Sequence, residues 1–156
     1  TQSSPLAAHA IKRLSTYVPL NGKGMWALLE AIVQLSSSEH HRIRLWGARA
    51  FVEQSQMPAC SFVIMRTPHV VDLITELLMD ENPTVKSNAI AAVFNLACSP
   101  MNLRVMGRNR LLMDALADAI TDCKQVDDAA RRQAVLTILC LANHQKSMKM
   151  VAKQHN

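Results

Sequence analysis

The sequence predicts an all-α fold built from about three three-helix units in series. Hydrophobic residues make up 49% of the chain and aromatic residues only 4%, so the apolar content is mostly Ala, Leu, Val, Ile and Met. Apolar positions recur at helical spacing between breaks that contain Pro, Gly or Asn. One apolar segment also recurs later in the chain, as it does in repeat proteins.

The recurrence is visible without any gap in the alignment. The run AIAAVFNLA at 89–97 aligns with AVLTILCLA at 134–142. The same offset places residues 103–106 on residues 148–151 and Arg108 on Lys153, so apolar residues match apolar ones and basic residues match basic ones. We therefore predict two copies of one unit.

A fainter copy precedes these two, at a slightly shorter offset. This offset places Ala48 on Ala89 and Val52 on Val93. It also places Phe62, Ile64 and Met65 on Leu103, Val105 and Met106.

The punctuation of the best copy predicts three helices. Asn82 and Pro83 open the first, because Asn caps a helix and Pro is tolerated in its first turn, and Ser99-Pro100 ends it. A short helix follows at about 102–106 and breaks at 107–109. The last of the three helices spans about 111–121.

With its helices ordered as short, medium and long, this unit resembles the armadillo repeat. In that order the helix opened by Asn82 and Pro83 is the long third helix, which in armadillo repeats carries a characteristic Asn-Pro opening and an Asn-Leu-Ala ending. The matching residues are Asn82, Pro83, Val85, Ala89, Asn95, Leu96 and Ala97, followed by Asn102 and Val105 on the next short helix. The resemblance implies a right-handed α-solenoid, an α-α superhelix of about three armadillo-type repeats.

The resemblance also divides the rest of the chain. Residues 1–156 are expected to form one armadillo-like domain, excised from a longer protein, with 1–38 as an N-terminal cap or degenerate repeat, 39–81 and 82–126 as repeats and 127–156 as a truncated repeat. Within these, we expect a short helix at 5–14, a loop at 19–24, medium helices at 25–35 and 68–80, and a long helix at 39–53.

Armadillo proteins lay extended peptides along a concave groove lined by their third helices. If this chain does the same, one face of each third helix lines the groove. That face is Thr84, Asn88, Ala91 and Asn95 in the best copy, with Ile43, Gly47, Ala50 and Gln54 before it and Ala129, Gln133, Leu136 and Cys140 after it. The amides of Asn95 and Gln54 are suited to a peptide backbone, although Asn95 has the alternative of bonding within the fold.

The groove differs from that of the nuclear-import receptors of this family. Their groove has Trp four residues before the Asn, where this chain has Ala91, with Ala50 and Leu136 in the neighbouring copies. Recognition of basic localisation signals is therefore not expected, and we place Trp26 and Trp46 in the core or on a flank.

The charge pattern suggests an acidic partner. The formal net charge is +5, and basic residues cluster near the third helices as Arg42, Arg44, Arg49, Lys86, Arg131 and Arg132. A solvated helix face is the alternative explanation of this ridge, and it is also our explanation of the acidic stripe formed by Asp114, Asp118 and Asp122.

Catalysis has little support in the sequence. It contains no glycine-rich phosphate loop, no GxSxG and no HExxH, and Cys140 with His144 supplies only two metal ligands where a structural zinc usually needs four. We expect no enzyme activity, cofactor, metal or membrane span. Four scattered cysteines without a secretory signal favour a reducing cytoplasmic or nuclear location.

The sequence therefore predicts a non-enzymatic scaffold that binds a protein or peptide partner. Candidate partner-binding residues are Gln54, Thr84, Asn88, Ala91, Asn95, Gln133, Leu136, Arg49, Lys86 and Arg132. Two alternatives stay open: self-association through exposed ends or a surface rich in the nine methionines, and nucleic-acid binding along the basic ridge.

Overall fold

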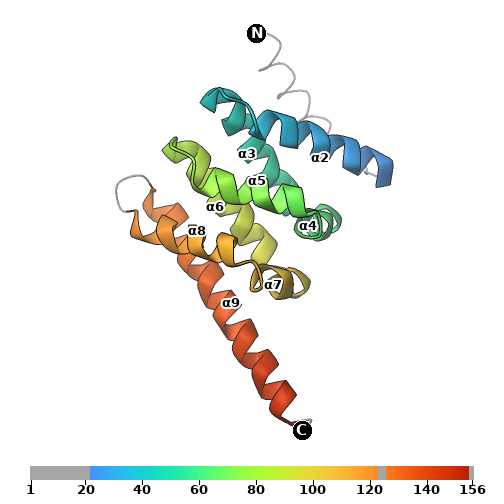
Figure 1. Ribbon diagram of the computed structural model, residues 1–156, viewed down its shortest axis with the longest axis vertical. Helices are drawn as coiled ribbons and strands as arrows, with labels where there is room; N and C mark the ends of the chain where they lie inside the picture. The colour runs from blue at the N-terminus through green and yellow to red at the C-terminus, as the bar shows by residue number, and fades with distance from the viewer. Residues whose placement is uncertain (1–21, 123–125, 155–156) are drawn as a thin grey trace.

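The computed structural model describes residues 22–122 and 126–154, and these ranges contain helices and no strand. The all-α class is therefore confirmed for the described residues, while the helix expected at 5–14 lies outside them. The helices are α2 (Gly22–Ser36), α3 (His41–Ser55), α4 (Pro58–Met65), α5 (Pro68–Leu78), α6 (Pro83–Ala97), α7 (Pro100–Met106), α8 (Arg110–Thr121) and α9 (Asp128–Gln154) (Figure 1).

The helix starts follow from local capping chemistry. The side chain of Asn82 accepts hydrogen bonds from the backbone N–H groups of Thr84 and Val85 at 3.0 and 3.2 Å, which satisfies two of the donors left over at the start of α6. Asp127 caps α9 in the same way, accepting from the N–H of Ala130 at 2.7 Å. The predicted Asn-Pro opening is thus confirmed.

Helix starts repeat along the chain at a constant step. Helices α3, α4 and α5 begin at His41, Pro58 and Pro68, and α6, α7 and α8 begin at Pro83, Pro100 and Arg110, so each start follows its counterpart by the same distance in sequence. We call this distance the unit length. The step from α6 to α9 is slightly longer, and it matches the offset that the sequence predicted for this pair.

The helices pack in two rows (Figure 1). In one row α5 contacts both α2 and α8, and in the second row α6 contacts both α3 and α9. The rows pack together through the pairs α2 with α3, α5 with α6 and α8 with α9, while α4 and α7 pack against each other at one side. The buried apolar side chains between the rows form a single cluster.

Two elements differ from the expectation. The predicted loop at 19–24 is wrong for residues 22–24, because α2 already begins at Gly22. α9 runs unbroken to Gln154, whereas α6 and α7 are separate helices. The reason is local: Gln145 stands at the position of α9 that corresponds to Pro100, and it keeps the backbone N–H that a proline lacks.

Candidate functional site

One side of the α3, α6 and α9 row faces away from the core. On α6, Thr84 is exposed and Asn88, Ala91 and Asn95 are half-buried, while Val85 on the opposite side is fully buried. On α9, the corresponding Ala129, Leu136 and Cys140 are exposed and Gln133 is half-buried. The structure therefore brings the predicted α6 and α9 stripes together on adjacent helices, and we call this surface the α3–α6–α9 face.

The stripe expected on α3 was shifted by one position. By the observed unit length, Gln54 corresponds to Leu96 and not to Asn95, and it is buried with 1% of its surface exposed. Gly47 is buried as well and corresponds to Ala89. Because one residue turns a helix by about 100°, the shorter offset inferred from the sequence placed core positions on the surface.

The corrected α3 stripe contains different chemistry. Arg42, Trp46, Arg49 and Glu53 are the counterparts of Thr84, Asn88, Ala91 and Asn95. Arg42 and Arg49 are exposed and Trp46 is half-buried, with the guanidinium carbon of Arg49 lying 5.3 Å from the centroid of the Trp46 ring. Sequence reasoning missed Trp46 on this face, and the spacing of Pro58 and Pro100 contained the signal that would have found it.

The amides of α6 are partly engaged inside the fold. The Nδ2 group of Asn95 donates to the carbonyl oxygen of Val52 at 3.3 Å and to Oγ of Ser55 at 3.1 Å, which ties α6 to α3. Asn88 donates from Nδ2 to the carbonyl oxygen of Thr84 at 2.8 Å. The alternative of local bonding for Asn95 is therefore what the geometry shows.

Three residues of the predicted basic ridge form ion pairs. Arg44 Nε lies 2.6 Å from Asp80 Oδ2, and Lys86 Nζ lies 2.9 Å from Asp122 Oδ2. Lys86 and Asp122 follow Arg44 and Asp80 by one unit length each, so one interaction occurs twice. Arg131 pairs with Asp128 at 2.9 Å and donates to the carbonyl oxygen of Val126.

These pairs correct two expectations. Lys86 exposes only 8% of its surface and holds α6 to the residue after α8, so it contributes to the packing within the unit 82–126. Asp122 is half-buried and paired, unlike the fully solvated stripe that the sequence suggested. Asp114 and Asp118 are exposed, as expected.

Electrostatics strengthen the first pair. Burial favours the neutral form of Asp80, but the hydrogen bonds from Arg44 and from the backbone N–H of Asn82, with the positive charges of Arg44 and His41, outweigh it, and the pKa of Asp80 falls below its ordinary value. The hydrogen bond to Asp80 raises the pKa of Arg44. The pair stays ionised across the neutral range.

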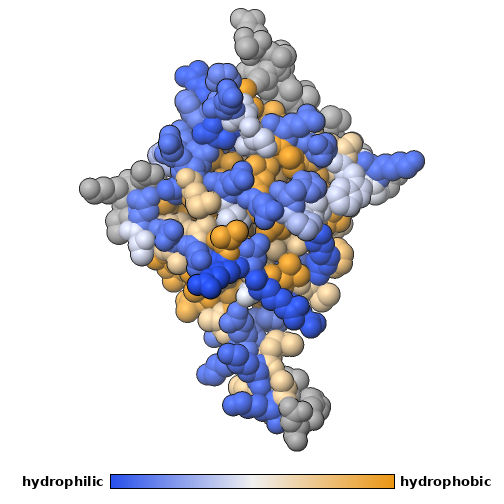
Figure 2. Space-filling view, in the orientation of Figure 1, coloured by the Kyte–Doolittle hydropathy of each residue, from blue (hydrophilic) through white to orange (hydrophobic). Residues whose placement is uncertain are grey.

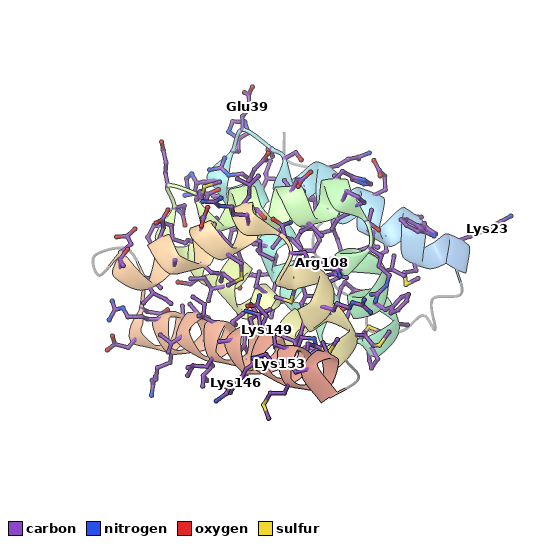
Figure 3. All side chains as sticks on the ribbon, turned by 60° about the horizontal axis from the view of Figure 1, so that its bottom comes forward. Lys23, Glu39, Arg108, Lys146, Lys149 and Lys153 are labelled. Atoms are coloured by element: carbon purple, nitrogen blue, oxygen red, sulfur yellow. The ribbon has the colours of Figure 1, made fainter. Side chains whose placement is uncertain are left out.

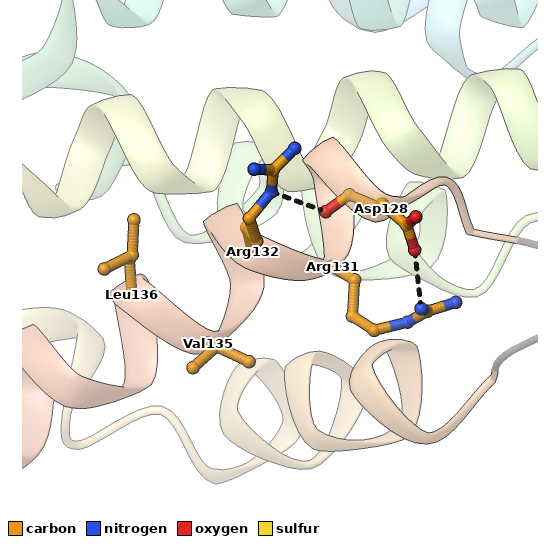
Figure 4. Close-up of a pocket in the computed structure, with 5 residues that line it drawn as sticks. All are labelled: Asp128, Arg131, Arg132, Val135 and Leu136. Atoms are coloured by element: carbon orange, nitrogen blue, oxygen red, sulfur yellow. Dashed lines mark hydrogen bonds and ion pairs between the residues drawn. The ribbon is translucent and has the colours of Figure 1, made fainter.

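A depression of about 580 Å³ lies on the first half of α9 (Figure 4). Its lining residues are Asp128, Arg131, Arg132, Val135 and Leu136. Arg132 is exposed, with its Nε donating to the carbonyl oxygen of Asp128 at 3.2 Å. A guanidinium beside two exposed aliphatic side chains provides hydrogen-bond donors for carbonyl or carboxylate oxygens next to an apolar contact.

A second basic surface escaped the sequence reasoning. It consists of five exposed side chains on α7, just after it, and on the C-terminal half of α9: Arg104, Arg108, Lys146, Lys149 and Lys153. We call this the C-terminal basic surface. The available signal was the complete lack of Asp and Glu in residues 129–156 and in residues 82–113.

The described residues contain no cluster of three or more His, Cys, Asp or Glu side chains suited to a metal ion. Cys60 is buried, and this burial raises the pKa of its thiol, while Cys98 and Cys140 are exposed. In the described ranges no single helix has the length and hydropathy to cross a membrane; α6 and α7 reach them only as a pair bent by 119°.

Comparison of the chain with protein-family models, with curated proteins and with solved structures finds no match.

Proposed function

We propose that this chain is a non-enzymatic scaffold of the armadillo type, a right-handed α-solenoid that holds an extended segment of a partner protein along the α3–α6–α9 face. The support is the same unit length in helix starts and in ion pairs, the arrangement of the helices in rows, and the Asn82 to Ala97 motif on α6. Each unit packs mainly on its neighbours, as in solenoids.

One observation carries the binding proposal: outward positions of α3 and α9, on either side of α6, hold side chains of the types that protein interfaces use. Trp46 and Arg49 on α3 and Arg132 and Leu136 on α9 combine aromatic, guanidinium and aliphatic groups. Aromatic residues and Arg dominate binding energy at protein interfaces. Thr84, Asn88 and Ala91 on α6 lie between them and Gln133 lies on α9, whereas Gln54 and Lys86 are withdrawn from the site by their burial.

The test uses Trp46 as its own reporter. A Trp26→Phe background leaves Trp46 as the sole tryptophan, and a random peptide library is selected on this protein. Selected peptides should shift the fluorescence emission of Trp46. The double variant Arg49→Glu with Leu136→Asp should weaken their binding about tenfold or more. Selected peptides that bind the parent and this double variant equally, with equal helical spectra, would contradict the proposal.

Self-association is supported by a separate observation. Ala48 and Ile90 occupy equivalent positions on α3 and α6 and are fully buried by the next helix in the row, whereas their counterpart Val135 on α9 is 38% exposed. Leu139, one turn further along, is 52% exposed. If a second copy covers this strip, light scattering shows a dimer that Val135→Glu dissociates; a constant monomer mass across concentrations removes this candidate.

The nucleic-acid alternative has lost support. Arg44, Lys86 and Arg131 were half of the basic ridge, and all three form ion pairs within the fold. Counterion release requires cations that can exchange to phosphate.

A further inference from the structure

The C-terminal half of α9 extends beyond α7 and α8 as a projection of the molecule (Figure 1). In the space-filling view this projection is mostly hydrophilic with a few apolar patches, unlike the apolar centre of the same face (Figure 2). Met148 and Met150 are 46% and 56% exposed on it. The projection therefore combines lysines with exposed thioether side chains.

The charge on this surface is uncompensated by its surroundings. Figure 3 shows Lys146, Lys149 and Lys153 on one stretch of α9, with Arg108 on the adjoining segment. The ion pairs of the described residues involve none of these four or Arg104. Both chain segments that build this end of the molecule lack carboxylates over the ranges 82–113 and 129–156.

Two depressions flank the lysines. One, of about 250 Å³, lies where α9 meets the end of α7, with Arg104, Arg108, Met148 and Lys149 among its lining. The other, of about 440 Å³, has Lys146, Lys149, Met150 and Lys153 among its lining. Lys149 lines both, so the two depressions share the Lys149 side chain.

Helix α7 packs beside the lysine-bearing part of the molecule, α9. Gln145 Nε2 on α9 donates to the carbonyl oxygen of Gly107 at 3.4 Å, at the end of α7. The helix that carries Arg104 therefore packs against the helix that carries the three lysines.

From these features we infer that the C-terminal basic surface docks an acidic protein segment that also carries aliphatic side chains. Its carboxylates face the stripe of Lys146, Lys149 and Lys153, which lie at i, i+3 and i+7 on one face of α9. Its aliphatic side chains enter the depressions beside Met148 and Met150, since methionine adapts to varied apolar partners.

Two other anionic partners fit less well. Binding of single-stranded nucleic acid without sequence preference relies on aromatic side chains for base stacking, and residues 100–156 contain no Phe, Tyr or Trp. A membrane-lying helix needs one continuous apolar face, but Met148 and Met150 are two residues apart and therefore point about 160° away from each other on α9. The surface is suited to carboxylates with apolar neighbours in a protein.

The inference is independent of the α3–α6–α9 face. The test titrates the chain into a fluorescein-labelled peptide of repeated Glu-Leu-Glu-Ser and follows anisotropy. The matched variants are Lys149→Glu and Lys23→Glu, which change the net charge equally, and Lys23 is exposed on α2, far from Lys149 (Figure 3). Lys149→Glu should weaken binding about tenfold and Lys23→Glu by less than about twofold.

Further comparisons complete the test. A peptide with Gln in place of Glu should lose binding, and Lys149→Ala, which keeps the helix, should weaken binding by a smaller factor than the reversal. Equal weakening by Lys149→Glu and Lys23→Glu would overturn the inference, because it would reflect net charge alone. Tighter binding of a single-stranded oligonucleotide or of phosphatidylserine vesicles than of the peptide would also overturn it. A result on the Trp46 reporter leaves this outcome unchanged, because the two surfaces are separate.

Discussion

Gly47 sets how closely α2 and α3 can approach. A Cβ atom added at Gly47 would lie 2.7 Å from the backbone nitrogen of Ser36 and 2.9 Å from its Cα. Alanine favours a helix over glycine by about 1 kcal/mol, but a clash with backbone atoms requires α2 to move. We expect Gly47→Ala to lower the free energy of unfolding by about 1–3 kcal/mol in urea titrations. Gly22→Ala, where no atom lies within 4 Å, is the control, and an unchanged midpoint for Gly47→Ala would contradict the close approach.

Asp80 makes the free energy of unfolding depend on pH in the acid range. Because the pKa of Asp80 is lower in the fold than its unfolded value of about 3.9, its contribution is complete above that value and is lost as the pH falls through the folded value. Asp80→Asn should therefore cost about 2 kcal/mol at neutral pH, and the difference from the parent should shrink under acid. Unfolding midpoints against pH measure this. Asp128→Asn, whose carboxylate is 86% exposed, should change little, and parallel pH profiles for the parent and Asp80→Asn would refute the role.

Residue chemistry explains which parts of the site were predictable. Thr84, Ala91 and Leu136 were placed on the outward face because helical spacing fixes the face once the register is known. The ion pair of Lys86 was not predictable, since its partner Asp122 is distant in sequence and reaches it only because α6 and α8 both pack on α5 and α9.

At the scale of helices, α9 owes its length to Gln145. Gln145→Pro would remove a backbone donor and place the proline ring against the carbonyl group of Leu141, which costs about 3 kcal/mol within a helix. We expect hydrogen exchange to become fast beyond residue 145 and helical ellipticity to fall. Gln145→Ala removes only the side-chain bond to Gly107 and should keep the protection; equal protection in the Pro variant would show that α9 is already broken there.

The alignment of one helix on its counterpart in the next unit was the part of the helix prediction that the sequence left uncertain by one residue. The offset between α6 and α9 was right because the runs at 89–97 and 134–142 align position by position without a gap. The offset between α3 and α6 was wrong by one because Ala, Val and Gly occur on several faces of α3, so apolar matching alone does not fix its rotation. Aligning Pro58 with Pro100 fixes it, since both prolines open a short helix.

At the scale of the molecule, the single apolar cluster predicts one cooperative unfolding transition. Trp26 and Trp46 lie in α2 and α3, so fluorescence reports on that end, whereas far-ultraviolet circular dichroism reports on all helices. The two transitions should coincide in urea. A fluorescence midpoint below the circular dichroism midpoint would mean that α2 and α3 unfold separately from α6 to α9.

The sequence also predicted the class of the whole molecule better than its charge distribution. Helical periodicity is a local property of the sequence, whereas a charged surface depends on which cations pair with carboxylates that the packing of the helices brings near them. The cations that looked clustered, Arg44 and Lys86, bind carboxylates inside the fold, and the surface at Lys149 forms only because α9 continues past Gln145.

The two ion pairs of Arg44 and Lys86 have a consequence for how such a chain can change over time. The carboxylate stands equally far along the chain from the cation in each pair, and the second pair follows the first by one unit length. A gain or loss of one unit length of codons between the two pairs therefore brings the cation of one unit together with the carboxylate of another. The spacing between the two residues in the sequence stays the same. A step one codon shorter would turn the helix and leave a buried carboxylate such as Asp80 without its cation. In each pair, one acidic side chain thus ties the interaction to the unit length.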